Sequence, residues 1–194
     1  AVMNTWVKQT GYPLLEVEAT RVSGQVNIDI SQRRFLYDHL LDQEMSDPTL
    51  WQIPISLLSS SISEETSILM TEEKASLPTE IPDGDNSQGW VKLNSNQTGF
   101  YRVSYDNAEW ERLRTAIQNL QLPSTDRLGL QNDAYALVRA GFADAPLFLS
   151  LAGSYKGEQD ATVWSDLATN LRGMEALLYE EPYLDQFQAY GRDL

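Results

Sequence analysis

The sequence contains no cysteine and only one histidine, His39, in 194 residues. Without cysteine the chain forms neither disulfides nor thiolate metal sites, which favours a reducing compartment. A zinc site needs three protein ligands, drawn mainly from histidine, cysteine and carboxylates, and one imidazole cannot build it. A Ser-His-Asp assembly would also have to use His39, and the sequence has no G-x-S-x-G elbow to present the serine. We therefore interpret His39 as a surface residue in a connecting loop.

Basic residues are scarce as well: 14 of them stand against 28 acidic residues, which gives a formal net charge of −14. A surface of this charge repels phosphate backbones, so nucleic acid is not an expected partner. No apolar run is long enough to span a bilayer, and no signal peptide is visible, so no membrane partner is expected either. Neither a P-loop nor a dinucleotide fingerprint occurs.

Carboxylates are abundant, and some of them stand next to each other in the chain. These adjacent pairs are Glu64-Glu65, Glu72-Glu73 and Glu180-Glu181. In so acidic a chain such pairs are interpreted as solvated faces rather than acid–base dyads. The residues therefore predict no catalytic residue and no metal ligand in this chain, and they leave the substrate-binding residues unknown.

The first half of the chain, up to about Tyr105, alternates apolar and polar residues with the period of a strand. Short runs of this kind are separated by turn-rich clusters and by one long connection, LYDHLLDQEMSDPT. The runs include QVNIDI, LWQIPIS, TSILM, WVKLN and GFYRVSY. Pro54 indicates an edge position for its strand, because proline cannot donate to a ladder. The spacing, with no helices between the runs, predicts an antiparallel β-sandwich.

After Tyr105 the apolar residues recur with the period of a helix. Asp106 followed by Glu109 predicts a capping box at the start of the first helix. Further helices are predicted to begin at Ser124 or Thr125, Asp144, Asp160 and Pro182. Short loops favour antiparallel neighbours, so the second half is predicted to be an antiparallel α-helical array. The predicted fold class is α+β, with the change from strands to helices near Asp106.

The same periodic positions predict two hydrophobic cores. The sheet core is predicted to contain Val26, Ile28, Ile30, Trp51, Ile53, Trp90 and Phe100. The helical core is predicted to contain Trp110, Leu113, Ile117, Tyr135, Trp164 and Leu167. The tryptophans are interpreted as core anchors rather than as a platform for a ligand.

The first residues, MNTWVKQTGYPLLEVEA, predict a short helix around Trp6 that stops at Gly11 and is followed by a strand. A helix of barely two turns is not stable alone. Two interpretations are open from the residues alone. The helix is either a terminus packed on its own domain or the severed end of an upstream domain.

Several blocks of the sequence resemble one family when they are taken together and in order. The blocks are MNTWVKQTGYPLLEVEA, WVKLNSNQTGFYRVSYD, LPSTDRLGLQNDAYALVRAG and TVWSDLATNL. In this order they are similar to the zinc-dependent gluzincin aminopeptidases (aminopeptidase N-like), and especially to the puromycin-sensitive, cytosolic alanyl branch. The resemblance covers nearly the whole chain.

The resemblance implies a division of the chain and a place for it in a larger enzyme. Residues 1–11 would be the tail of the catalytic domain, residues 12–105 a β-sandwich domain, and residues 106–194 the beginning of a truncated C-terminal helical domain. This division favours the interpretation of the short helix around Trp6 as the severed end of an upstream domain. The family's H-E-x-x-H zinc motif and G-x-M-E-N substrate loop are absent here, so the zinc cofactor would belong to the parent enzyme and none to this chain.

The implied function is that of a non-catalytic portion of a cytoplasmic zinc metallo-aminopeptidase, which removes N-terminal residues from peptides. This portion would space and cover the catalytic cleft, with the catalytic domain and the remaining helices as its partners. Gly99 is expected to permit a close approach, and Arg102 or Arg127 to tie the sandwich to the helices through a carboxylate. The alternative is a stand-alone sandwich and helical-repeat module that binds a protein or peptide without enzymatic activity.

Overall fold

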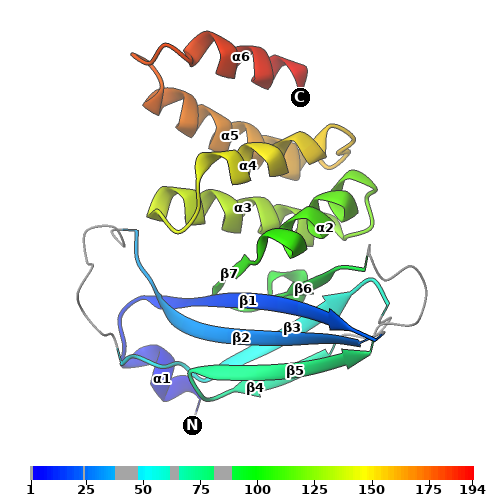
Figure 1. The fold of residues 1–194 in the computed structure, drawn as a ribbon. Helices are drawn as coiled ribbons and strands as arrows, with labels where there is room; N and C mark the ends of the chain where they lie inside the picture. Colours follow the sequence, from blue (N-terminus) through cyan, green and yellow to red (C-terminus); the bar gives the residue numbers. More distant parts are fainter. Residues whose placement is uncertain (1, 24, 38–47, 62–65, 81–88) are drawn as a thin grey trace.

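The computed structural model describes residues 2–23, 25–37, 48–61, 66–80 and 89–194. The predictions for His39, for Glu64-Glu65 and for most of the long connection fall outside these residues. Within them, the strands come first along the chain and, apart from the short first helix, the α-helices come last, so the fold class is α+β. Figure 1 shows helices α2 to α6 stacked above the sheets, with α6 farthest from them, whereas α1 lies beside the strands at the opposite end.

One sheet has four strands in the order β5-β2-β1-β7. Its strands are β1 (Tyr12–Val22), β2 (Gln25–Phe35), β5 (Lys74–Glu80) and β7 (Arg102–Tyr105). β1 pairs antiparallel with β2, but it pairs parallel with β7. The prediction of purely antiparallel sheets is therefore wrong at this edge. The chain between β1 and β7 contains the five other strands, so it is long enough for the crossover that a parallel pair requires.

The other sheet has three strands in the order β4-β3-β6. They are β3 (Ile53–Ser59), β4 (Thr66–Met70) and β6 (Val91–Leu93). Pro54 lies in β3, the central strand, so the predicted edge position is wrong. β6 pairs only with residues 57–59 of β3, and at Pro54 the strand has just one paired neighbour, β4. The missing N–H of proline therefore costs no ladder bond on the β6 side.

The predicted sheet core is buried with one exception. Val26, Ile28, Ile30, Trp51, Ile53 and Trp90 are all at most 4% exposed. The prediction for Phe100 is wrong, because this residue is 70% exposed. Strand β7 begins only at Arg102, and the buried face of this segment carries Tyr101, Val103 and Tyr105. Since neighbouring residues of an extended chain point to opposite sides, Phe100 is turned outward.

The helices begin with α1 (Met3–Val7), which precedes the first strand. The others are α2 (Asn107–Gln118), α3 (Ser124–Ala140), α4 (Ala145–Ala152), α5 (Ala161–Leu177) and α6 (Leu184–Asp193). Short 3-10 turns are present at η1 (Ser95–Gln97) and η2 (Gly153–Tyr155). The last strand ends at Tyr105 and α2 begins at Asn107, so the predicted change of secondary structure at Asp106 is confirmed.

The predicted helical core is confirmed in part. Trp110, Leu113, Ile117 and Leu167 are at most 3% exposed, whereas Tyr135 and Trp164 are only half-buried against the core. The Trp164 indole Nε1–H donates to the backbone oxygen of Glu158 at 2.9 Å. Its polar edge therefore stays at the rim of the core, as is usual for tryptophan.

The helix starts follow the predictions less closely. Asp160 caps α5, because its Oδ1 accepts from the backbone of Thr162 and Val163. Asp144 precedes α4 without a side-chain cap bond. At α3 the N-cap residue is Pro123, so Ser124 and Thr125 already lie inside the helix and the predicted cap is wrong. Proline is compatible with this position because its fixed φ suits a helix start.

Candidate functional site: a carboxylate junction between sheets and helices

The sheets meet the helices through carboxylates that point from the helical side to backbone amides of the strand-bearing part. Four carboxylates take part, and each accepts one N–H from the backbone of the strand-bearing part: Asp106 from Ala19 (2.9 Å), Glu109 from Val91 (2.7 Å), Asp126 from Asn96 (2.9 Å) and Asp133 from Val103 (3.3 Å). Asp106 precedes α2, Glu109 lies on α2, and the other two lie on α3. Hydrogen bonds of ionised acceptors are about twice as strong as neutral ones, so these bonds define how the helices sit on the sheets. We call this set of carboxylates and their partners the junction.

Three strands each supply a cation to one of three of these carboxylates. Arg21 on β1 pairs with Glu109 at 2.7 Å, Lys92 on β6 with Asp126 at 2.7 Å, and Arg102 on β7 with Asp133 at 3.1 Å. In these pairs every cation comes from a strand and every anion from a helix. This charge complementarity specifies one docking of the two parts and disfavours others.

The pair between Lys92 and Asp126 is the most deeply buried, with side chains 1% and 0% exposed. The Lys92 ammonium also donates to the backbone oxygens of Leu93 (3.0 Å) and Asn94 (2.8 Å), so its three donors have three acceptors. Burial lowers the pKa of Lys92, and the Asp126 carboxylate opposes this shift. A buried ion pair of this kind offers little net stability, but losing one member is costly because the other charge stays buried alone.

Asp133 is the carboxylate whose protonation is most changed by the fold. Burial raises its pKa to about 6, although Arg102 and Lys92 both favour the ionised form. The Arg102 side chain is only 28% exposed and the Asp133 side chain only 5%, so solvent screens this pair weakly. The prediction that Arg102 ties the strands to the helices through a carboxylate is confirmed.

Glu109 joins three elements. Its Oε1 accepts from the backbone of Val91, and its Oε2 pairs with Arg21 at 2.7 Å and with Arg112 at 3.6 Å. Burial raises the pKa of Glu109, and these partners oppose the shift. The predicted capping box is half right. Asp106 accepts from the Glu109 backbone at 2.8 Å, but the Glu109 side chain is directed to the sheets instead of returning to Asp106.

The turn between β6 and β7 is held against α3 in a strained conformation. Asn94, Asn96 and Gln97 all have left-handed backbone angles, with φ of 60°, 54° and 56°. Asn94 stabilises its conformation locally, because its side chain bonds to both the N–H (2.7 Å) and the C=O (3.1 Å) of Gly99. The Gln97 side chain fills the space beside Gly129 of α3, where a Cβ atom would lie only 1.8 Å from its Nε2.

Gly99 itself permits the close approach that the sequence predicts. A Cβ atom at Gly99 would lie 2.2 Å from the ring of Tyr101. The absence of a side chain at Gly99 therefore lets the aromatic ring of Tyr101 fold back over the turn and reach the protein interior.

Arg127 has a different role from Arg102. It forms a two-pronged pair with Glu158, with both N···O distances 2.6 Å. Glu158 lies just before α5, so this pair joins helical segments to each other and not the strands to the helices. The pKa of Glu158 is lowered: burial acts to raise it, but the hydrogen bonds from Arg127 and from the backbone of Asp160 and Gln159 outweigh burial.

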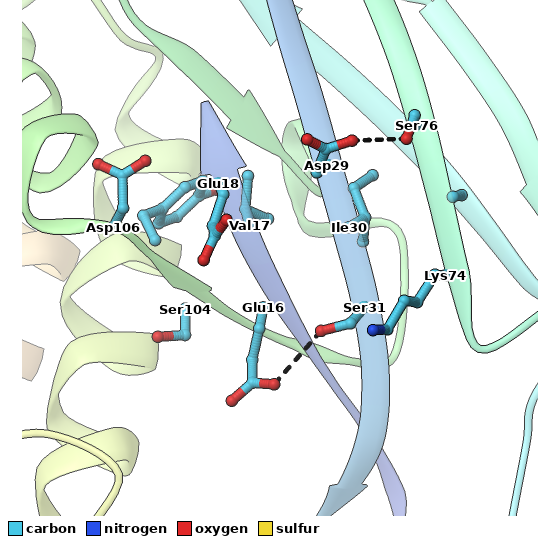
Figure 2. A pocket seen from close by; sticks show the side chains of 12 residues that line it. Glu16, Val17, Glu18, Asp29, Ile30, Ser31, Lys74, Ser76, Ser104 and Asp106 are labelled. Carbon is cyan, nitrogen blue, oxygen red and sulfur yellow. Dashed lines mark hydrogen bonds between the residues drawn. The ribbon is translucent and has the colours of Figure 1, made fainter. Parts of the chain in front are cut away.

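A polar groove of about 520 Å³ lies beside the junction, on the open face of the four-stranded sheet. Figure 2 shows the carboxylates of Glu16, Glu18, Asp29 and Asp106 around it, with Lys74 at the far side. The strand register produces this arrangement, because Glu16 is opposite Ser31, and Glu18 is opposite Asp29. Glu16 accepts from Ser31 at 3.3 Å and Asp29 from Ser76 at 2.5 Å, while Asp106 is engaged at the junction.

This groove has no arrangement that identifies a reaction or a metal. Among the residues that the structure describes, no group of three His, Cys, Asp or Glu side chains could hold a metal ion. Glu72-Glu73 and Glu180-Glu181 are exposed, as expected of solvated faces. The prediction that the chain carries no catalytic and no metal-binding residue stays a prediction.

Sequence reasoning identified Arg102 at the junction, but it did not single out Lys92, Asp133, Arg21 or the second role of Glu109. One signal was available for Lys92. It is the only charged residue in the run Trp90–Leu93, whose other members are apolar, and a charge inside such a run indicates a buried partner. That partner, Asp126, lies 34 positions away along the chain, so only the tertiary structure identifies it.

Comparisons with known proteins agree with one another. The model of the ERAP1-like C-terminal domain matches residues 90–194. Aminopeptidase 2 of Candida albicans is 32% identical over 196 residues, covering 100% of this chain and 20% of that protein. Puromycin-sensitive aminopeptidase of Caenorhabditis elegans is 33% identical (91% of this chain, 18% of that protein). Human glutamyl aminopeptidase is 31% identical (84% and 17%).

The chain thus spans about a fifth of the length of the curated relatives that it matches. The match to the family model begins at Trp90, just before Lys92, and continues through the helices that carry Asp126 and Asp133. The helical half of the junction therefore lies wholly within the matched region, and Arg21 lies outside it.

Proposed function

Because the chain belongs to the ERAP1-like C-terminal domain family, we propose that it is a non-catalytic portion of a zinc aminopeptidase, holding a helical array at a fixed angle to a pair of sheets. The junction is the observation that carries this proposal. A region whose task is to position one part of an enzyme against another needs a rigid connection, and here four carboxylates and three cations connect the two parts.

We propose the following division: residues 1–11 as the end of the catalytic domain, residues 12–105 as a β-sandwich domain, and residues 106–194 as part of an antiparallel α-helical domain. The change from β7 to α2 at Asp106 supports the second boundary. Trp6 packs on Trp51, with ring centroids 6.4 Å apart, so α1 is fixed to the sheets whichever domain it belongs to.

The zinc ion of such an enzyme does not fit the residues of this chain. The described residues contain no three-ligand cluster, and His39 is the only histidine in the sequence. We therefore assign zinc, the attacking water and the grip on the substrate's amino terminus to regions of the enzyme other than these 194 residues. The contribution of this chain is to cover the cleft, which excludes water and positions the peptide.

The proposed substrates of the whole enzyme are peptides with a free N-terminal residue. The relatives reported above are all named aminopeptidases, which supports this assignment over a stand-alone interaction module. We propose a cytoplasmic location, which rests on the resemblance of the sequence blocks to the cytosolic alanyl branch of the family. Among the described helices none is both long and apolar enough to cross a membrane.

The test uses the full-length enzyme that carries this sequence. Replacing Lys92 by Met should loosen the helical array, and it should reduce kcat/KM for a peptide of several residues more than for a single-residue alanyl anilide. The short substrate makes fewer contacts with a distant cover, so it serves as the internal control. Equal loss on both substrates would contradict a covering role, and full activity of the isolated 194-residue chain would contradict the non-catalytic assignment.

A further inference from the structure

We draw no further inference here: the strongest candidate, the groove of about 430 Å³ between α5 and α6 that is lined by Leu171, Arg172, Phe187 and Arg192, carries nothing new, because a further helix packed there would restate the helical partners that the resemblance to the aminopeptidases already implies.

Discussion

The junction and the hollow between α1 and the segment Thr98–Tyr101 both lie on the strand-bearing part of the molecule, and they differ in the charge of the residues that form them. At the junction Lys92 has three acceptors and Asp133 has two donors, although both side chains are buried. None of the residues that line the hollow is charged, and Met3 and Phe100 beside it are 65% and 70% exposed. Buried charges that are paired specify one arrangement of the elements that carry them, whereas exposed apolar side chains specify none. The junction is therefore the connection that fixes the helices on the sheets.

The largest expected effect tests the junction at its most buried pair. Replacing Lys92 by Met leaves the Asp126 carboxylate buried without its cation, and we expect the free energy of unfolding to fall by about 3–5 kcal/mol. Urea denaturation at 25 °C and pH 7 measures this change. The double variant Lys92→Met/Asp126→Leu should be more stable than the single variant, because no charge is then left buried. A single variant as stable as the wild type would show that the pair is unimportant for the junction.

The next effect concerns the contact between α3 and the strained turn. Replacing Gly129 by Ala places a methyl group where the end of the Gln97 side chain lies, so this side chain must move, and we expect a loss of up to about 1 kcal/mol in spite of the better helix propensity of alanine. Gly191 on α6 is the matched control, because a Cβ atom there meets nothing within 4 Å. Gly191→Ala should therefore stabilise the protein by up to about 1 kcal/mol. Thermal unfolding measures both variants. A change in stability of the same sign for Gly129→Ala and Gly191→Ala would contradict the tight docking of the turn.

The pH dependence of stability distinguishes Asp133 from ordinary surface carboxylates. The fold raises its pKa from 3.8 to about 6, so the stability contributed by Asp133 is greatest below pH 3.8 and is lost as the pH rises through about 6. Relative to Asp133→Asn, which does not titrate, the wild type should lose about 1 kcal/mol between pH 5 and pH 7. Urea unfolding of both proteins at these two pH values gives the difference.

Other groups titrate in both proteins, and taking the difference between wild type and Asp133→Asn removes their contribution. The burial of Glu109 raises its pKa too, but Glu109 is present in both. A difference that grows with pH instead of falling would mean that Arg102 and Lys92 outweigh burial at Asp133.

The smallest effect is expected outside the junction. Arg114 contacts Glu111 one helical turn away at 2.6 Å, and the side chains are 32% and 68% exposed. Replacing Arg114 by Ala should change the free energy of unfolding by no more than about 0.5 kcal/mol, because solvent screens exposed pairs. A loss comparable to that of Lys92→Met in the same urea experiment would mean that burial does not separate structural from incidental ion pairs in this protein.

Much of the fold could be predicted from the sequence because local patterns decide it. The alternation Val26, Ile28, Ile30 specifies which face of β2 is buried, and the cap at Asp106 marks the start of α2. β5 was missed as a strand, since Pro78 interrupts the pattern KASLPTE and the strand lies at the edge of its sheet. The exposed position of Phe100 agrees with the alternation in GFYRVSY, because Phe100 shares its side of the strand with Arg102 and Ser104, whereas the opposite side is apolar; the prediction placed Phe100 on the wrong side.

The candidate site was less predictable than the fold. Arg102 was expected to bind a carboxylate, but the sequence could not say which of the acidic residues would accept it. Nothing in the sequence distinguishes Asp133 from the other acidic residues of the helices, because its partners come from β7, which lies against α3 only in the folded protein.

The sequence by itself determined the order of strands and helices, the position where one gives way to the other, and the absence of thiolate or multi-histidine chemistry. These properties depend on residue type and on spacing along the chain. The tertiary structure alone decided the parallel pairing of β1 with β7, the partners of Lys92 and Asp133, and the hollow between α1 and Phe100. Each of these depends on residues far apart in the chain, and their pairing follows from how whole elements pack rather than from any local pattern.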